Sequence, residues 1–62
     1  MKYKGKYFIV KRDQGIFREG MICHCFDEQD TFVRMWFQHP LFGDMHEVKV
    51  PKEAMEVFRE RK

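Results

Sequence analysis

The stretch "GMICHCFDEQDTFVRMWF", residues 20–37, decides the fold of this chain. It contains both cysteines and the only tryptophan. Two runs rich in Ile, Phe, Val, Met and Trp flank the polar residues 27–30, which have the composition of a turn. Runs of this length and composition on either side of a turn are typical of two antiparallel strands. The stretch therefore predicts a central hairpin with strands near 20–26 and 31–37.

The length of the connecting loop decides which side chains share a face, because side chains alternate between the two faces of a strand. A loop over 27–30 would place Arg34 beside the cysteines, and burying an unpaired arginine costs several kcal/mol. We therefore expect a loop over 27–31. The first face of the hairpin would then carry only apolar side chains: Met21, Cys23, Cys25, Val33, Met35 and Phe37. The second face would carry Ile22, His24, Phe26, Phe32, Arg34 and Trp36.

This register also predicts particular neighbours across the hairpin. It sets Phe26 opposite Phe32, and Ile22 opposite Trp36. Aromatic and β-branched pairs of this kind stabilise antiparallel sheets.

The cysteines belong to the apolar face and are expected to be buried, reduced and free of metal. Free cysteine behaves as a small hydrophobic residue. Cys23 and Cys25 are separated by one residue, whereas zinc sites usually place about two to four residues between paired cysteines. A catalytic thiol needs a lowered pKa and a neighbouring base, and His24 points to the opposite face. We expect no metal, no cofactor and no catalytic residue.

The rest of the chain shows the same alternation of short apolar runs and turns. Further strands are predicted near 5–12, 16–18 and 45–50. Pro51 suits the first position of a helical turn, which is expected over 51–54. The tail beyond it stays open between helix and strand. With 62 residues, the chain has room for one domain.

In order, these segments resemble an SH3-like barrel. Residues 20–25 are similar to the glycine and core strand after the first long loop of that fold, and residues 31–37 to its third strand. "VPKEAMEVF", residues 50–58, resembles its ending of strand, helical turn and closing strand. The resemblance implies an all-β domain over residues 1–62, a small five-stranded SH3-like barrel with a short C-terminal helical turn. The first loop is shorter than in signalling SH3 domains and lacks their acidic and tyrosine pattern, so binding of proline-rich peptides is not implied.

Composition and charge restrict the classes of function. The net charge is +2, from 12 basic and 10 acidic residues, which does not demand a nucleic-acid partner. No apolar run approaches the roughly 20 residues of a membrane span, so no membrane partner is expected. Reduced thiols predict a cytoplasmic protein. Neither paired carboxylates nor a phosphate-binding glycine loop is placed by spacing, so neither an enzyme nor a small-molecule substrate is expected.

The second face of the hairpin is the candidate binding surface. Either the chain's own N-terminal strand or tail covers it, or a partner does. Trp, Phe and Arg are common at interface hot spots, and the loop over 39–43 would add further apolar contacts. We expect a protein partner, or self-association, to contact Trp36, Phe32, Arg34, His24, His39 and Phe42.

Nucleic acid is the alternative partner. Stacking aromatics beside an arginine would form a platform for a single strand. Lys2, Lys4 and Lys6 would project from one side of an N-terminal strand. The basic residues expected to contact the nucleic acid are those that precede the first acid: Lys2, Lys4, Lys6, Lys11 and Arg12.

Overall fold

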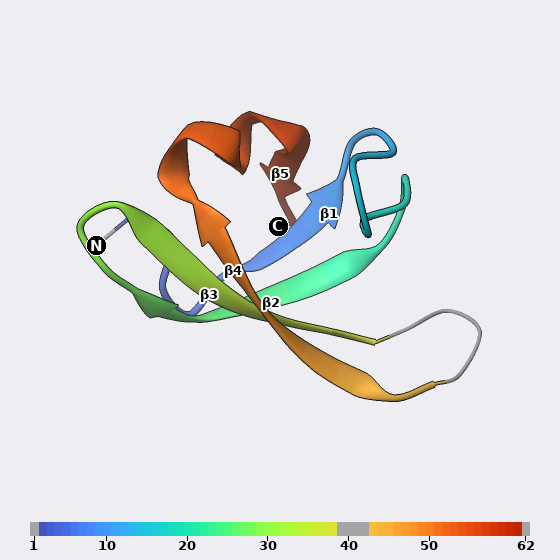
Figure 1. Ribbon diagram of the computed structural model, residues 1–62, viewed down its shortest axis with the longest axis horizontal. Helices are drawn as coiled ribbons and strands as arrows, with labels where there is room; N and C mark the ends of the chain where they lie inside the picture. The colour runs from blue at the N-terminus through green and yellow to red at the C-terminus, as the bar shows by residue number, and fades with distance from the viewer. Residues whose placement is uncertain (1, 39–42, 62) are drawn as a thin grey trace.

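The structure is a computed structural model that describes residues 2–38 and 43–61 (Figure 1). Its elements follow in the order β1 (Tyr7–Val10), β2 (Ile22–Glu28), β3 (Phe32–Gln38), β4 (Met45–Pro51), the 3-10 helix η1 (Lys52–Val57) and β5 (Phe58–Glu60). The all-β class and the helical turn near the C-terminus are confirmed. The turn is longer than expected and leads directly into a strand.

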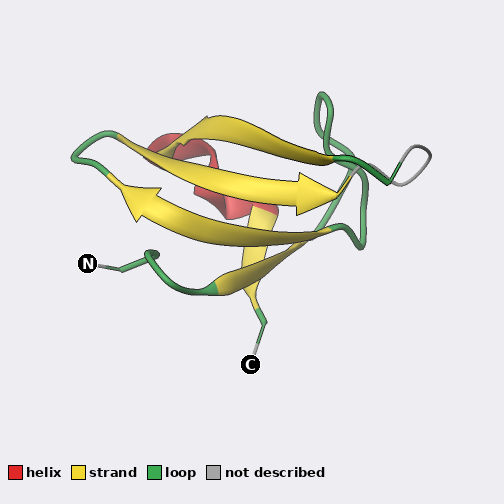
Figure 2. Cartoon of the chain, turned by 90° about the horizontal axis from the view of Figure 1, so that it is seen from below, coloured by secondary structure: helices red, strands yellow, loops and turns green. Residues whose placement is uncertain are grey.

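The strands form one antiparallel sheet in the order β4-β3-β2-β1-β5. β1 lies between β2 and β5, so the end of the chain returns to its beginning (Figures 1 and 2). β4 and β5 are the two edges and do not pair with each other, so the five-stranded sheet is not closed into the expected barrel. η1 connects β4 to β5, and β5 pairs with β1.

The core lies on one face of the curled sheet, with η1 packed on the same side (Figure 2). Every second residue is buried throughout β3 and in β2 as far as Cys25, and Cys25, Val33 and Met35 have no exposed surface. The buried residues are Phe8, Val10, Phe17, Cys23, Cys25, Val33, Met35, Phe37, Val50, Met55, Val57 and Phe58. The expected apolar face of the hairpin is therefore confirmed, with Met21 half-buried at its end.

The pairing within the central hairpin differs from the expected one. His24, rather than Ile22, lies opposite Trp36, and Cys25 lies opposite Met35. The loop covers only residues 29–31, and a bulge at Phe26 shifts the register beyond it. The expected pairs and the loop over 27–31 are therefore wrong. The two faces of the hairpin are nevertheless as expected. The observed pairing of Cys23, His24 and Cys25 with β3 differs from the expected one by two residues, and an even shift keeps each side chain on the same face.

The expected strand over 16–18 is also wrong. Gln14 and Phe17 exchange two backbone hydrogen bonds of 2.9 Å across a tight turn. Phe17 then turns inward, and its ring lies 5.1 Å from that of Phe58 and 5.7 Å from that of Phe37. The fifth strand is β5 instead. The C-terminal tail, which the sequence left open between helix and strand, is helical in η1 and extended in β5.

The N-terminal strand begins later than expected. The N–H of Lys6 donates to the carbonyl oxygen of Tyr3 at 3.2 Å, which closes a turn before β1. Gly5 occupies this turn with φ of 84°, a conformation that glycine adopts without the steric cost of a Cβ. Lys2, Lys4 and Lys6 therefore do not follow one side of a strand, as the alternation of an extended chain would require.

Candidate partner-binding face

The side of the sheet opposite the core, called here the outer face, carries large side chains that remain partly accessible. Tyr7 is 51% exposed, Ile22 46% and Trp36 37%. The outer face consists of Tyr7, Ile22, His24, Phe26, Phe32, Arg34 and Trp36. β5 pairs with the edge of β1 and does not cross this face. Within the described residues, the alternative in which the chain's own tail covers it is therefore wrong.

Rings from three strands meet in the middle of the outer face. Tyr7 on β1 lies opposite His24 on β2, which in turn lies opposite Trp36 on β3. The ring centroids of Tyr7 and His24 are 4.5 Å apart, and Phe26 packs 5.3 Å from Trp36. Aromatic pairs at these distances contribute about 0.5–1.5 kcal/mol beyond their burial. The rings of Tyr7, His24, Trp36 and Phe26 form what we call the aromatic row.

Charged groups border the aromatic row on the side of β4. The guanidinium of Arg34 lies 3.8 Å from Asp27 Oδ2 and 3.5 Å from Glu47 Oε2. The Lys49 ammonium sits 4.2 Å from the centre of the Phe32 ring, within the range of a cation–π contact. Arg34 is thus available on the outer face, but two carboxylates already offset its charge.

The structure brings together four of the residues expected at the binding site. His24 and Trp36 are direct neighbours, and Arg34 and Phe32 follow along the same face of β3. His39 and Phe42 lie outside the described residues. Tyr7, which is 51% exposed, was not anticipated at this site. The alternation around Phe8 and Val10 places Tyr7 on the outer face, but only the pairing of β1 with β2 brings it to His24.

Part of the charge of the basic residues at the alternative site is offset by carboxylates. Lys6 Nζ lies 3.4 Å from Glu60 Oε1, and Arg12 Nη2 lies 3.1 Å from Glu56 Oε1. Lys2, Lys4 and Lys11 are exposed. Exposed ion pairs of this kind contribute little to stability, but they reduce the positive potential that a phosphate backbone would meet.

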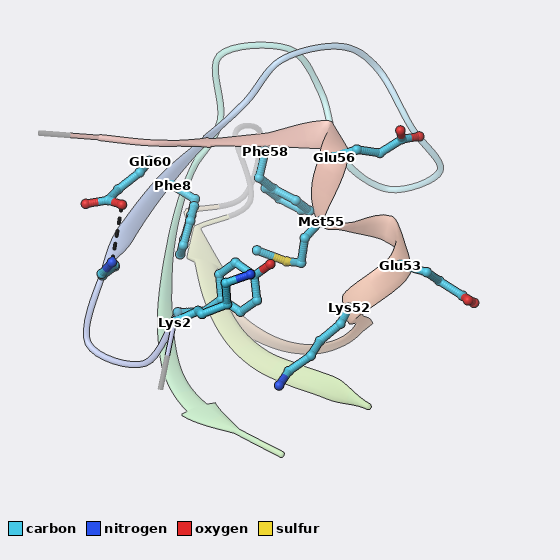
Figure 3. A pocket seen from close by; sticks show the side chains of 10 residues that line it. Lys2, Phe8, Lys52, Glu53, Met55, Glu56, Phe58 and Glu60 are labelled. Atoms are coloured by element: carbon cyan, nitrogen blue, oxygen red, sulfur yellow. Dashed lines mark hydrogen bonds and ion pairs between the residues drawn. The ribbon is translucent and has the colours of Figure 1, made fainter. Parts of the chain in front are cut away.

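A groove opens between the N-terminal turn, η1 and β5, on the side of the sheet that holds the core (Figure 3). Phe8, Met55 and Phe58 line its apolar part. Charged residues of both signs surround it: Lys2, Lys6, Lys52, Glu53, Glu56 and Glu60. This mixture selects neither an anionic nor a cationic ligand.

The two thiols lie in the core. Both cysteines are free and buried. Burial raises the pKa of Cys23 to about 11 and also raises the pKa of Cys25 above its ordinary value. Across residues 2–38 and 43–61, no three His, Cys, Asp or Glu side chains are placed to share a metal ion.

The same two ranges include no helix with the length and apolar character needed to cross a membrane. Comparison with protein-family models, with curated proteins and with solved structures found no match to this chain.

Proposed function

We propose that this chain is a small, non-catalytic binding module that recognises a protein partner through the outer face. The aromatic row carries this proposal, because it presents the exposed rings of Tyr7 and Trp36 on a hydrogen-bonded sheet. Aromatic side chains on a rigid support lose little conformational entropy on binding, and tryptophan and tyrosine are enriched at interface hot spots. Arg34 at the border would add a polar contact.

An SH3-like arrangement of the fold is part of the proposal. The order β4-β3-β2-β1-β5, with a 3-10 helix between β4 and β5, supports this assignment. The fold by itself assigns no activity, since small β domains carry many functions. We also place the protein in the cytoplasm, a compartment that agrees with two free thiols.

A protein partner is favoured over a nucleic acid by the charge pattern. Carboxylates lie within 4 Å of Lys6, Arg12 and Arg34. A surface that tracks a phosphate backbone relies on cations that release counterions on binding. The aromatic row would still allow base stacking, so the nucleic-acid alternative is an outcome of the test.

The test is affinity capture with the wild-type protein and matched alanine variants, with and without nuclease. Trp36→Ala and Tyr7→Ala should each weaken partner binding, by about 30-fold for a central anchor worth about 2 kcal/mol. Ile16→Ala removes a large side chain that is 60% exposed but lies away from the sheet, and should have no effect. Circular dichroism verifies that each variant folds.

Two results would reject the proposal. Capture that is equal for wild type, Trp36→Ala and Tyr7→Ala would show that the outer face is not the interface. Capture that disappears after nuclease treatment and on combined Lys2, Lys4 and Lys6→Glu substitution would put the nucleic-acid alternative in its place.

A further inference from the structure

β4 leaves one complete edge without a partner in the described part of the chain. It spans seven residues, Met45–Pro51, and pairs only with β3. Exposed edges of this length invite pairing with another chain, and proteins usually cover or interrupt them. Figure 2 shows β4 at the margin of the sheet.

The hydrogen-bond pattern shows which backbone groups face this edge. The Lys52 N–H donates to the Thr31 carbonyl oxygen at 2.9 Å, in the same register as the β3–β4 ladder. Opposed residues in an antiparallel pair alternate between bonded and non-bonded positions. Val48 therefore bonds to β3, whereas the N–H and C=O groups of Glu47 and Lys49 point away from the sheet.

The side chains of these two residues are self-complementary. Glu47 and Lys49 stand on either side of Val48, on the same face, and both are exposed. If a second β4 strand runs antiparallel about a two-fold axis at Val48, each glutamate faces the lysine of the other copy. The backbone groups of Glu47 and Lys49 then meet as a bonded pair, and two valines meet at a close, non-bonded position.

We propose that two copies of this chain associate along β4, antiparallel and two-fold symmetric about Val48. Opposite charges directly across an antiparallel pair stabilise it, and like charges destabilise it. An axis at residue 47 would place glutamate opposite glutamate, and an axis at residue 49 would place lysine opposite lysine. The charge pattern therefore selects the axis at Val48.

The same register covers an exposed apolar side chain. Met45, 58% exposed, would lie opposite Pro51 of the second copy, whose neighbour on β3 is Phe32. Pro51 lacks an N–H, but its carbonyl oxygen can still accept a bond from Met45. The pairing extends the sheet in its own plane, so the aromatic row stays open. This association goes beyond the proposed function and does not depend on it.

Charge reversal and mixing test the proposal directly. Glu47→Lys places lysine opposite lysine at both symmetric positions, and Lys49→Glu places glutamate opposite glutamate. Each variant alone should dimerise about tenfold more weakly than wild type. An equimolar mixture should restore association, because every pair across a mixed dimer is then of opposite charge. Glu60→Lys, on β5 at the opposite edge of the sheet, is the matched control and should dimerise like wild type.

Sedimentation equilibrium gives the mass of each protein as a function of concentration, and native mass spectrometry identifies the mixed dimer by its mass. Hydrogen exchange provides an independent measurement at the backbone. The amides of Glu47 and Lys49 should exchange more slowly as concentration rises, whereas that of Glu60 on the opposite edge should not change.

A wild-type protein that stays monomeric up to millimolar concentration would overturn the proposal. A mixture of the two variants that associates no better than either alone would also overturn it. A folding defect cannot explain association that is restored by mixing. A variant that folds poorly alone would fold equally poorly in the mixture.

Discussion

The backbone N–H of Tyr3 donates a 2.8 Å hydrogen bond to the carboxylate of Glu28, which ties the N-terminal turn to the end of β2. The Lys52 ammonium lies 3.0 Å from the same carboxylate, so that residue 28 also connects to η1. The Glu28 side chain is only 5% exposed. One acidic group therefore joins three segments that are far apart in the chain.

The first prediction concerns stability in acid. The hydrogen bond from Tyr3 and, with it, the ion pair with Lys52 lower the pKa of Glu28 from its ordinary value of 4.5 to about 2. A lowered pKa in the folded state means that the unfolded chain binds the proton more tightly. The contribution of this group is therefore complete above pH 4.5 and is lost as the pH falls towards 2.

Urea unfolding of wild type and Glu28→Gln between pH 2 and 7 measures this contribution. The variant should be less stable at neutral pH, and the difference should shrink as the pH falls through the window between about 4.5 and 2. Glu53→Gln, at an exposed position on η1, is the control. A difference that stays constant with pH would contradict the assignment.

The second prediction is that both thiols react slowly in the native protein. The thiolate is the reactive form, and burial raises the pKa of Cys23 to about 11. Labelling with iodoacetamide, followed by mass spectrometry, should be slow without denaturant and fast in urea. Rapid native labelling, or one zinc ion bound per chain, would contradict it.

The third prediction is that Phe37 is required for a stable fold. Its side chain is 5% exposed and lies between the rings of Phe17 and His46. Removing a buried phenylalanine ring costs about 3–5 kcal/mol, which approaches the whole stability of many small domains. Phe37→Ala should therefore lose its cooperative thermal transition. Phe32→Ala, at a half-buried position on the outer face, should retain one. Equal melting of the two variants would contradict the assignment of faces.

The fourth prediction is that Trp36 fluorescence reports on the outer face. Trp36 is 37% exposed, and its ring packs against that of Phe26. Acrylamide should quench it in the free protein, and a bound partner should protect it. Phe26→Ala should increase quenching, because it removes the neighbouring ring. A fully protected indole in the free monomer would place Trp36 in a covered site.

The sequence alone determined the faces of the central hairpin. Alternation along a strand is a property of the extended backbone, so Cys23 and Cys25 share one side of their strand, and the cost of burying Arg34 places Val33 on that side as well. The same rule placed Arg34 and Trp36 on the other side. These assignments hold although the pairing of the strands was wrong.

Only the tertiary structure decided the register, the extent of the elements and the composition of the outer face. β2 extends to Glu28 because Asp27 and Glu28 still pair with β3 beyond the bulge, and the Glu28 carboxylate also meets Tyr3 and Lys52, which are distant in sequence. Phe17 leaves the expected strand because its ring packs on Phe58.

The edges of the sheet were decided in the same way. Tyr7 reaches His24 only through the pairing of β1 with β2, and β4 becomes an edge only because β5 pairs with β1 instead. Alternation is set by each residue and its immediate neighbours, so a local sequence specifies it. The pairing of strands depends on the free energy of contacts between segments that are far apart in the chain. A local pattern of residues does not specify which distant segments meet.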